Sequence, residues 1–191
     1  MRDTAVLTIR ARDTTATFRL TCRSWASPEY QVPHLATFVH RRASTGQPLT
    51  VAAYADLADA LWPAAERIRA SGSDDGAHHR YQLTFDRRSE DRVTLRAESR
   101  ATHGPGAPYR WQTVCEAHGL AALYREAAEM MRRRARFMCG FARAYRLPPG
   151  YPTEADLLRQ RDRYQRWADR VDAGTLPAPV APEPVQARPE R

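Results

Sequence analysis

Arginine recurs along two segments of this chain in which polar and apolar residues alternate. A guanidinium group presents a planar set of N–H donors that matches two phosphate oxygens, so these residues could bind phosphate. A basic surface also gains affinity for a polyanion by releasing the counterions around it. The candidates are Arg10, Arg12, Arg19, Arg23, Arg80, Arg92, Arg96 and Arg100. The sequence predicts one basic surface if both segments belong to the same sheet.

A second group of arginines lies within one helical segment. It consists of Arg132, Arg133, Arg134 and Arg136. Such a cluster could follow a nucleic-acid groove or contact an acidic protein surface. Glu126 and Glu129 lie at helical spacing from the cluster and could pair with part of it. Arg134 alone falls on the apolar stripe of the helix, where it would either extend to solvent or meet a buried carboxylate.

Residue types that often carry catalysis are present without a pattern that specifies a reaction. Cys115 and His118 have the spacing of a metal-binding or thiol–imidazole pair, but no second pair accompanies them. His103 lies in a Gly/Pro loop and could serve as an acid or base. The acids between residues 86 and 91 could hold magnesium, although acids are expected in a hairpin turn. A hydrolase or nuclease is therefore the least favoured class, and we expect no catalytic residue, metal or cofactor.

All 30 basic residues are arginine, and the chain contains no lysine. This composition excludes a Walker A lysine, a Schiff-base lysine and a lysine-dependent nuclease site. Lysine and asparagine, which are both missing, have AT-rich codons, so a GC-rich genome would explain the arginine bias. The formal net charge of +8 is the better indication of a polyanionic partner.

Alternation with a period of two predicts β-hairpins over residues 4–23 and 80–100. In both, apolar side chains face one way while arginine and threonine face the other. Few aromatic residues fall on the arginine side, which favours contacts to a phosphate backbone over stacking on bases. A further strand is predicted over 109–114 and a short one over 35–41.

Helices are predicted to cover the apolar side of this sheet. Residues 117–146 form the longest helical pattern, whose apolar stripe is Leu120, Leu123, Ala127, Met130, Phe137, Phe141 and Ala144. Another helix is predicted over about 51–70, with Thr50 as its N-cap. Thr153 and Asp156 resemble a capping box that opens a last helix ending near residue 172. The fold class is α+β: an antiparallel sheet of two hairpins and a possible extra strand, with helices on one face.

The chain divides by composition into an α+β domain (1–147), a C-terminal helical appendage (148–174) and a disordered proline-rich tail (175–191). Trp167 lies on the arginine-rich appendage helix and is a candidate interface residue. A small helix of this kind can leave apolar surface uncovered, so we expect a homo-oligomer or a place in a larger complex. No apolar run approaches the ~20 residues of a membrane span, and no signal-peptide pattern is present, so a cytoplasmic location without a membrane partner is expected.

These observations favour a non-enzymatic basic accessory protein that binds nucleic acid, DNA or RNA, mainly through phosphate-backbone contacts. The alternative is a protein-interaction subunit: an adaptor, an inhibitor or a component of a larger complex. It would contact an acidic protein surface through the arginine-rich helix and the C-terminal region. A third interpretation of the same arginines is an ordinary solvated surface in an arginine-biased sequence.

Overall fold

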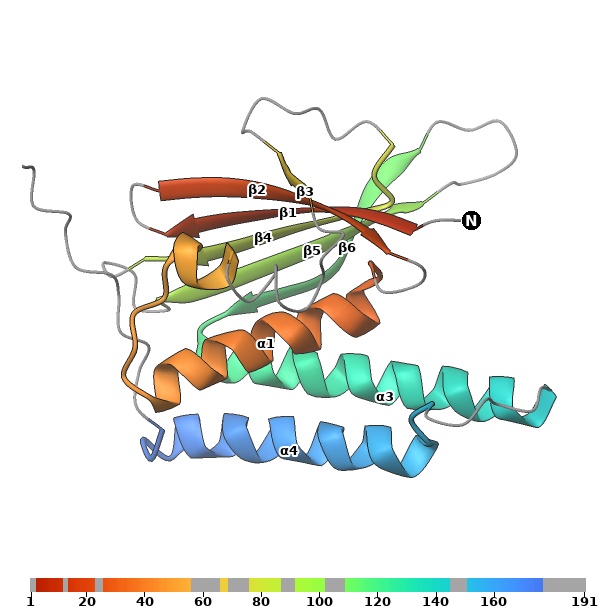
Figure 1. Ribbon diagram of the computed structural model, residues 1–191. Coiled ribbons are helices and arrows are strands. Elements are labelled where there is room, and N and C mark those ends of the chain that lie inside the picture. Colours follow the sequence, from red (N-terminus) through yellow and green to blue (C-terminus); the bar gives the residue numbers. More distant parts are fainter. Residues whose placement is uncertain are drawn as a thin grey trace, which may run out of the picture.

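The computed structural model describes residues 3–11, 14–22, 26–55, 66–68, 76–86, 92–101, 109–144 and 151–176 of the chain. The strands are β1 (Asp3–Ala11), β2 (Thr14–Cys22), β3 (Glu66–Ile68), β4 (His79–Phe85), β5 (Val93–Ala101) and β6 (Arg110–His118). The long helices are α1 (Pro28–Ser44), α3 (Leu120–Ala144) and α4 (Glu154–Asp172). A short helical segment covers residues 51–55. Figure 1 shows the sheet on one side of the molecule and the long helices on the other.

The six strands form one sheet in the order β3-β2-β1-β4-β5-β6. Both predicted hairpins are present as the antiparallel pairs β1–β2 and β4–β5, and β6 extends the sheet beside β5. The hairpins join through β1 and β4, which run parallel with Leu7 opposite Tyr81. A parallel join requires a crossover between the strands, and α1 lies in that connection. The α+β class is confirmed, and the sheet is mixed rather than wholly antiparallel.

One apolar core joins the sheet to all three long helices. Leu7 and Leu83 from the sheet are fully buried together with Leu35 of α1 and Leu123 of α3. Figure 1 shows α1 and α3 next to one face of the sheet and α4 farther from it. Leu157 of α4 belongs to the same buried cluster. The opposite face of the sheet therefore carries none of the long helices.

Helix α1 replaces the short strand predicted over 35–41. Pro28 occupies the first turn, where its missing N–H is not needed, and Ser27 precedes it in an extended conformation. Beyond these residues the buried positions Val32, Leu35 and Val39 follow the helical period. The prolines at 28 and 33 suggested that the chain is irregular here. Burial of the apolar face against the core stabilises the helix despite these prolines.

Helix α3 begins at Leu120 rather than at residue 117, because β6 extends to His118. Cys115 and Ala117 are buried strand residues two positions apart. Ala117 also lies three residues before Leu120, a spacing that fits a helix. Gly119 forms the turn between the two elements with φ of 89°, a backbone conformation that favours glycine. Its N–H donates to the carbonyl of Val93 at 2.8 Å. Residues 145 and 146 lie outside the described part of the chain.

Two predicted caps are present. The hydroxyl of Thr50 accepts from the N–H of Ala53 at 3.1 Å, and helical residues follow it to position 55. The predicted extension of this helix to residue 70 is wrong, because residues 66–68 form strand β3, which pairs with β2. At α4 the hydroxyl of Thr153 accepts from the N–H of Asp156 at 3.1 Å, and the Asp156 carboxylate accepts from the N–H of Thr153 at 2.9 Å. The predicted tail lies almost wholly in residues 177–191, outside the described ranges.

Candidate nucleic-acid interface

The side of the sheet away from the helices carries five of the predicted arginines. Strand alternation places Arg10 on β1, Arg19 on β2, Arg80 on β4, and both Arg96 and Arg100 on β5 on this side. We call the outward side chains of β1, β2, β4, β5 and β6 the open sheet face. Its other members include Thr8, Thr17, Gln82, Thr84, Thr94 and Thr113. The structure thus brings together arginines from two hairpins that are far apart in sequence.

One glutamate organises the centre of the open sheet face. The carboxylate of Glu98 on β5 pairs with Arg80 and, at 3.1 Å, with Arg96. Glu98 is only 4% exposed, although it points away from the core. The hydrogen bond from Arg80 lowers the pKa of Glu98, and burial opposes that shift. Glu98 therefore stays ionised and fixes two guanidinium groups, and it also cancels part of their charge.

A β-bulge places an aromatic side chain among these arginines. Ala97 pairs with Cys115, while the next residue, Glu98, pairs with Thr113, so Val114 is the extra residue of β6. The insertion reverses the alternation, and it turns Trp111 to the open sheet face although Cys115 faces the core. The guanidinium carbon of Arg80 lies 4.5 Å from the centre of the Trp111 ring. That of Arg100 lies 5.3 Å from it.

Trp111 was not predicted to be among the arginines, because no sequence signal marked the bulge. Guanidinium groups over the ring are held by cation–π attraction, which limits their motion. Tyr109 lies just before β6, is 66% exposed, and has Arg100 over its ring at 5.7 Å. The Trp111 ring is thus in contact with two guanidinium groups, which it helps to hold in place.

The open sheet face keeps a positive balance after these pairings. Among the described side chains of its strands, five arginines are opposed by Glu98 and Glu116, and Glu116 lies 3.4 Å from His118. Arg10 and Gln82 are exposed. Val6 is 4% exposed, and the strand register places it between Arg19 and Arg80. An apolar residue is buried there because long arginine side chains flank it.

Three predicted arginines are not part of this arrangement as described. Arg12 and Arg23 lie outside the described residues. Arg92 precedes β5 and is exposed, with φ of 46°. Its carbonyl accepts from the N–H of Asp86 at 3.0 Å, which closes the hairpin. Arg92 therefore occupies the hairpin turn at the end of the sheet.

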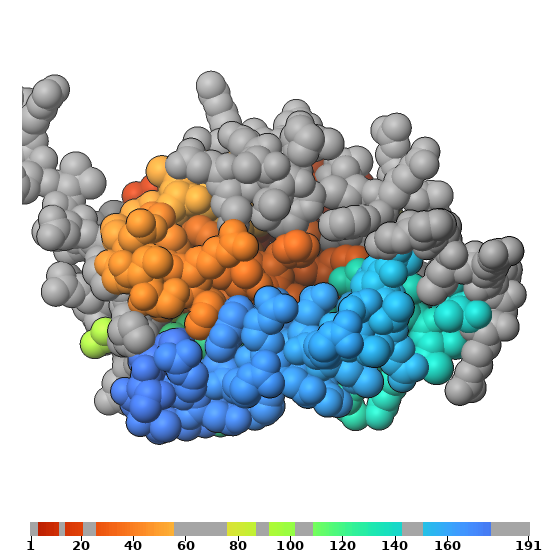
Figure 2. Space-filling view, turned by 60° about the horizontal axis from the view of Figure 1, so that its bottom comes forward, coloured from red at the N-terminus to blue at the C-terminus, as the bar shows by residue number. Residues whose placement is uncertain are grey.

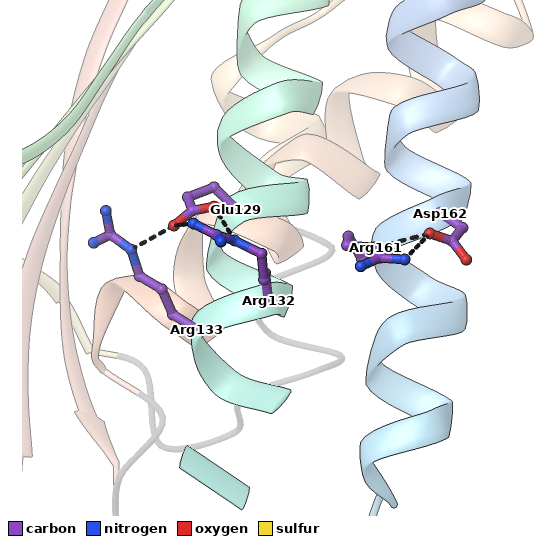
Figure 3. A network of polar contacts seen from close by, with 5 residues as sticks. All are labelled: Glu129, Arg132, Arg133, Arg161 and Asp162. Carbon is purple, nitrogen blue, oxygen red and sulfur yellow. Dashed lines mark hydrogen bonds and ion pairs between the residues drawn. The ribbon is translucent and has the colours of Figure 1, made fainter. Parts of the chain in front are cut away.

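The four arginines of the α3 cluster have different surroundings, because they lie on different sides of the helix. Glu129 accepts from Arg132 at 2.6 Å and from Arg133 at 3.1 Å, as Figure 3 shows. The hydrogen bond from Arg132 is the main cause of the lowered pKa of Glu129. Arg136 is exposed and pairs with no carboxylate among the described residues. Arg134 meets no carboxylate in that part of the chain either, and its guanidinium carbon lies 3.9 Å from the centre of the Tyr30 ring.

The last turns of α3 depart from the predicted apolar stripe. Phe137 is 69% exposed and Phe141 is 39% exposed, although both fall on the stripe in sequence. Their rings stack with centroids 6.0 Å apart. Figure 1 shows the final turns of α3 extending beyond the end of α4, so α4 does not cover them.

Trp167 packs within the molecule. Its ring stacks on His40 of α1 with centroids 3.5 Å apart and planes 9° from parallel. Tyr164 meets it edge-on at 5.2 Å. The His40 ring nitrogen Nδ1 lies 3.1 Å from the hydroxyl of Tyr124. Burial, with a smaller effect from Arg170, lowers the pKa of His40 to about 4. Trp167 therefore ties α4 to α1 and α3.

The catalytic candidates are not brought together. Cys115 faces the core and His118 the open side, and burial raises the pKa of the Cys115 thiol to about 12. His103, Glu90 and Asp91 lie outside the described residues. Within the described part of the chain no three metal-binding side chains gather. No helix among the described residues is long and apolar enough to cross a bilayer.

No family model, curated protein or solved structure matches this chain. A function for this protein is therefore inferred from the chemistry of its own side chains. Two features of that chemistry could be suspected from sequence. Glu98 is an acid in an otherwise basic strand pattern, and the spacing of Glu129 from Arg132 and Arg133 predicts their pairing.

Proposed function

We propose that the protein is a non-enzymatic accessory protein that binds nucleic acid through the open sheet face, mainly by contacts to the phosphate backbone. The observation that supports this most is the set of Arg10, Arg19, Arg80, Arg96 and Arg100 on one surface with a net positive balance. Threonine and glutamine side chains between them supply further neutral donors for phosphate oxygens. Because Trp111 lies against two guanidinium groups, base stacking would contribute less than charge.

A salt titration of affinity tests this function. Binding of a labelled single strand, a duplex and an RNA hairpin is followed by fluorescence anisotropy. If two to four arginines contact phosphates, affinity should fall roughly 10- to 100-fold between 50 and 200 mM salt. The absence of binding to all three ligands at 50 mM salt would contradict the proposal, and so would binding that does not change with salt.

A matched pair of variants locates the contact. Arg10→Gln with Arg100→Gln removes two charges from the open sheet face, and Arg132→Gln with Arg133→Gln removes two from α3. The first pair should weaken binding about tenfold and make the salt slope less steep by about 1 to 2. The second should have a much smaller effect, because Glu129 already holds both arginines. Equal losses would mean that only the overall charge matters.

The uncovered end of α3 favours a second candidate, a protein-interaction subunit. Phe137 and Phe141 form an exposed stacked pair, and Arg136 is an exposed cation one residue away. Apolar rings beside an unpaired arginine are typical of a contact with a partner that is apolar and acidic. Phe137 is the sharpest probe, because it is the more exposed of the two rings.

A pull-down after nuclease treatment separates the two functions. Arg136→Glu with Phe137→Ser should release a stoichiometric acidic partner, while Arg166→Glu, a charge reversal on α4, should retain it. Nucleic-acid affinity should change less in the Arg136→Glu, Phe137→Ser variant than in the open-face variant. A partner retained by both helix variants would exclude this surface.

A further inference from the structure

Three arginines converge on a pocket between α1, α3 and α4, on the side of the molecule opposite the open sheet face. The pocket has a volume of about 260 Å³ and is lined by Arg41 of α1, Arg134 of α3 and Arg163 of α4. Figure 2 shows α1, in orange, and α4, in blue, side by side on this surface. No carboxylate is found among the described lining residues.

Arg134 is the most constrained of the three. Its guanidinium carbon stacks over Tyr30, and its Nε atom is fully buried without a hydrogen-bond partner. A buried nitrogen of a charged group that lacks an acceptor costs free energy, so an anion bound at the pocket would offset part of that cost through its charge. The neighbouring His34 shows the same positive environment, because burial first and then Arg134 lower its pKa.

The walls of the pocket are held by contacts between helices. The hydroxyls of Thr37 and Tyr164 are 2.8 Å apart, and the Tyr164 hydroxyl donates to the Pro33 carbonyl at 2.9 Å. These bonds fix α4 against α1, so the pocket is formed before any ligand binds. Its lining also includes the apolar side chains of Phe38 and Met131.

A neighbouring groove between α3 and α4 provides the contrast. Its volume is about 380 Å³, and its three arginines are accompanied by Glu129 and Asp162. Arg132 pairs with Glu129 and Arg161 pairs with Asp162 at 2.6 Å. Figure 3 shows both pairs. The third arginine of that groove, Arg125, pairs with Asp172, so each of the three has a carboxylate partner. The described lining of the α1–α3–α4 pocket offers only cations and neutral groups.

We propose that the α1–α3–α4 pocket binds a small phosphate monoester, with its phosphoryl group among Arg41, Arg134 and Arg163 and its organic part against Phe38 and Met131. A phosphoryl dianion matches three guanidinium groups better than a carboxylate, which carries one charge. The volume lies below the usual range for drug-sized ligands, roughly 300–1,000 Å³, so the organic part is small. A free phosphate would use the same cationic end.

Calorimetric titration of the full chain at fixed ionic strength tests the pocket, with inorganic phosphate and phenyl phosphate as probes. Phenyl phosphate should bind and should raise the melting temperature more than inorganic phosphate. Equal affinities would assign the pocket to free phosphate and overturn the monoester. No binding by either probe would overturn the site itself.

Two variants of exposed arginines on α4 make the test specific. Arg163→Gln should weaken phenyl phosphate binding about tenfold or more, because it removes a charged donor. Arg166→Gln, three residues along and outside the lining, should stay within about twofold of the parent. Equal effects would overturn the proposal. Arg10→Gln with Arg100→Gln should leave this affinity unchanged, which separates the pocket from the open sheet face.

Discussion

Two glutamates each hold two arginines in this protein, and their surroundings differ. On the open sheet face Glu98 pairs with Arg80 and Arg96, and its side chain is 5% exposed. On α3 Glu129 pairs with Arg132 and Arg133, and its side chain is 31% exposed. Both arrangements leave one net positive charge. The first joins neighbouring strands, while the second lies within about one helical turn.

Arginine content alone therefore does not identify a binding surface. The α3 pairs are local, exposed and screened by salt, so they contribute little to stability. Glu98 instead holds arginines from two strands, one of which, Arg80, lies over Trp111. Further arginines of the same face lie on β1, β2 and β5. A surface arranged by tertiary contacts is the better candidate for a function.

The largest expected effect comes from neutralising the buried glutamate. Glu98→Gln should lower the free energy of unfolding by about 2 kcal/mol, because it leaves two guanidinium groups without their shared partner. The partial exposure of Arg80 and Arg96 keeps the loss below the value for a fully buried pair. Glu129→Gln should cost less than about 1 kcal/mol. Urea denaturation of both variants measures the difference, and equal losses would remove the distinction between the two sites.

The pH dependence of the free energy of unfolding should also differ between the Glu98 and Glu129 variants. The pKa of Glu98 is lower in the folded state than in the unfolded chain, so its ion pairs stabilise fully above about pH 5 and are lost as pH falls through the folded pKa. The stability of the parent should therefore fall more steeply below pH 5 than that of Glu98→Gln. The pKa of Glu129 is lowered as well, so Glu129→Gln should change the slope in the same direction, but by less, because its ion pairs are more exposed. The check is the free energy of unfolding between pH 2 and 7, and identical slopes for the parent and Glu98→Gln would contradict the assignment.

A smaller effect than that of Glu98→Gln is expected at Trp111. Trp111→Leu keeps an apolar side chain but removes the ring under Arg80 and Arg100, so the free energy of unfolding should fall by about 1 kcal/mol. Nucleic-acid affinity should fall about two- to fivefold, since the guanidinium groups lose orientation but keep their charge. Fluorescence anisotropy measures the affinity, and urea denaturation of the same sample measures the free energy of unfolding. A loss of affinity above about 50-fold would indicate base stacking instead.

The sequence predicted the hairpins and the α4 cap because each depends on neighbouring residues. Alternation around Leu7 and Leu83 requires one buried face, and Thr153 with Asp156 form a local motif. The parallel join of β1 and β4 could not be derived, because pairing between distant strands leaves no local pattern. Helix α1 was missed because Pro28 and Pro33 resemble breaks in the chain.

The open sheet face was predictable only in part. The outward arginines followed from alternation, but the sequence gives no sign of the extra Val114 that turns Trp111 toward them. The pairing at Glu129 followed from helical spacing, and the burial of Glu98 did not, since it depends on three strands meeting. The α1–α3–α4 pocket could not be predicted once α1 was missed.

Backbone amide NMR shifts during titration with a short oligonucleotide locate the bound nucleic acid on the protein. We expect the shifts to concentrate on outward residues of the sheet, such as Arg10, Gln82, Arg96 and Thr113, while residues 129–136 of α3 change little. Shifts concentrated on α3, with the sheet unchanged, would contradict it.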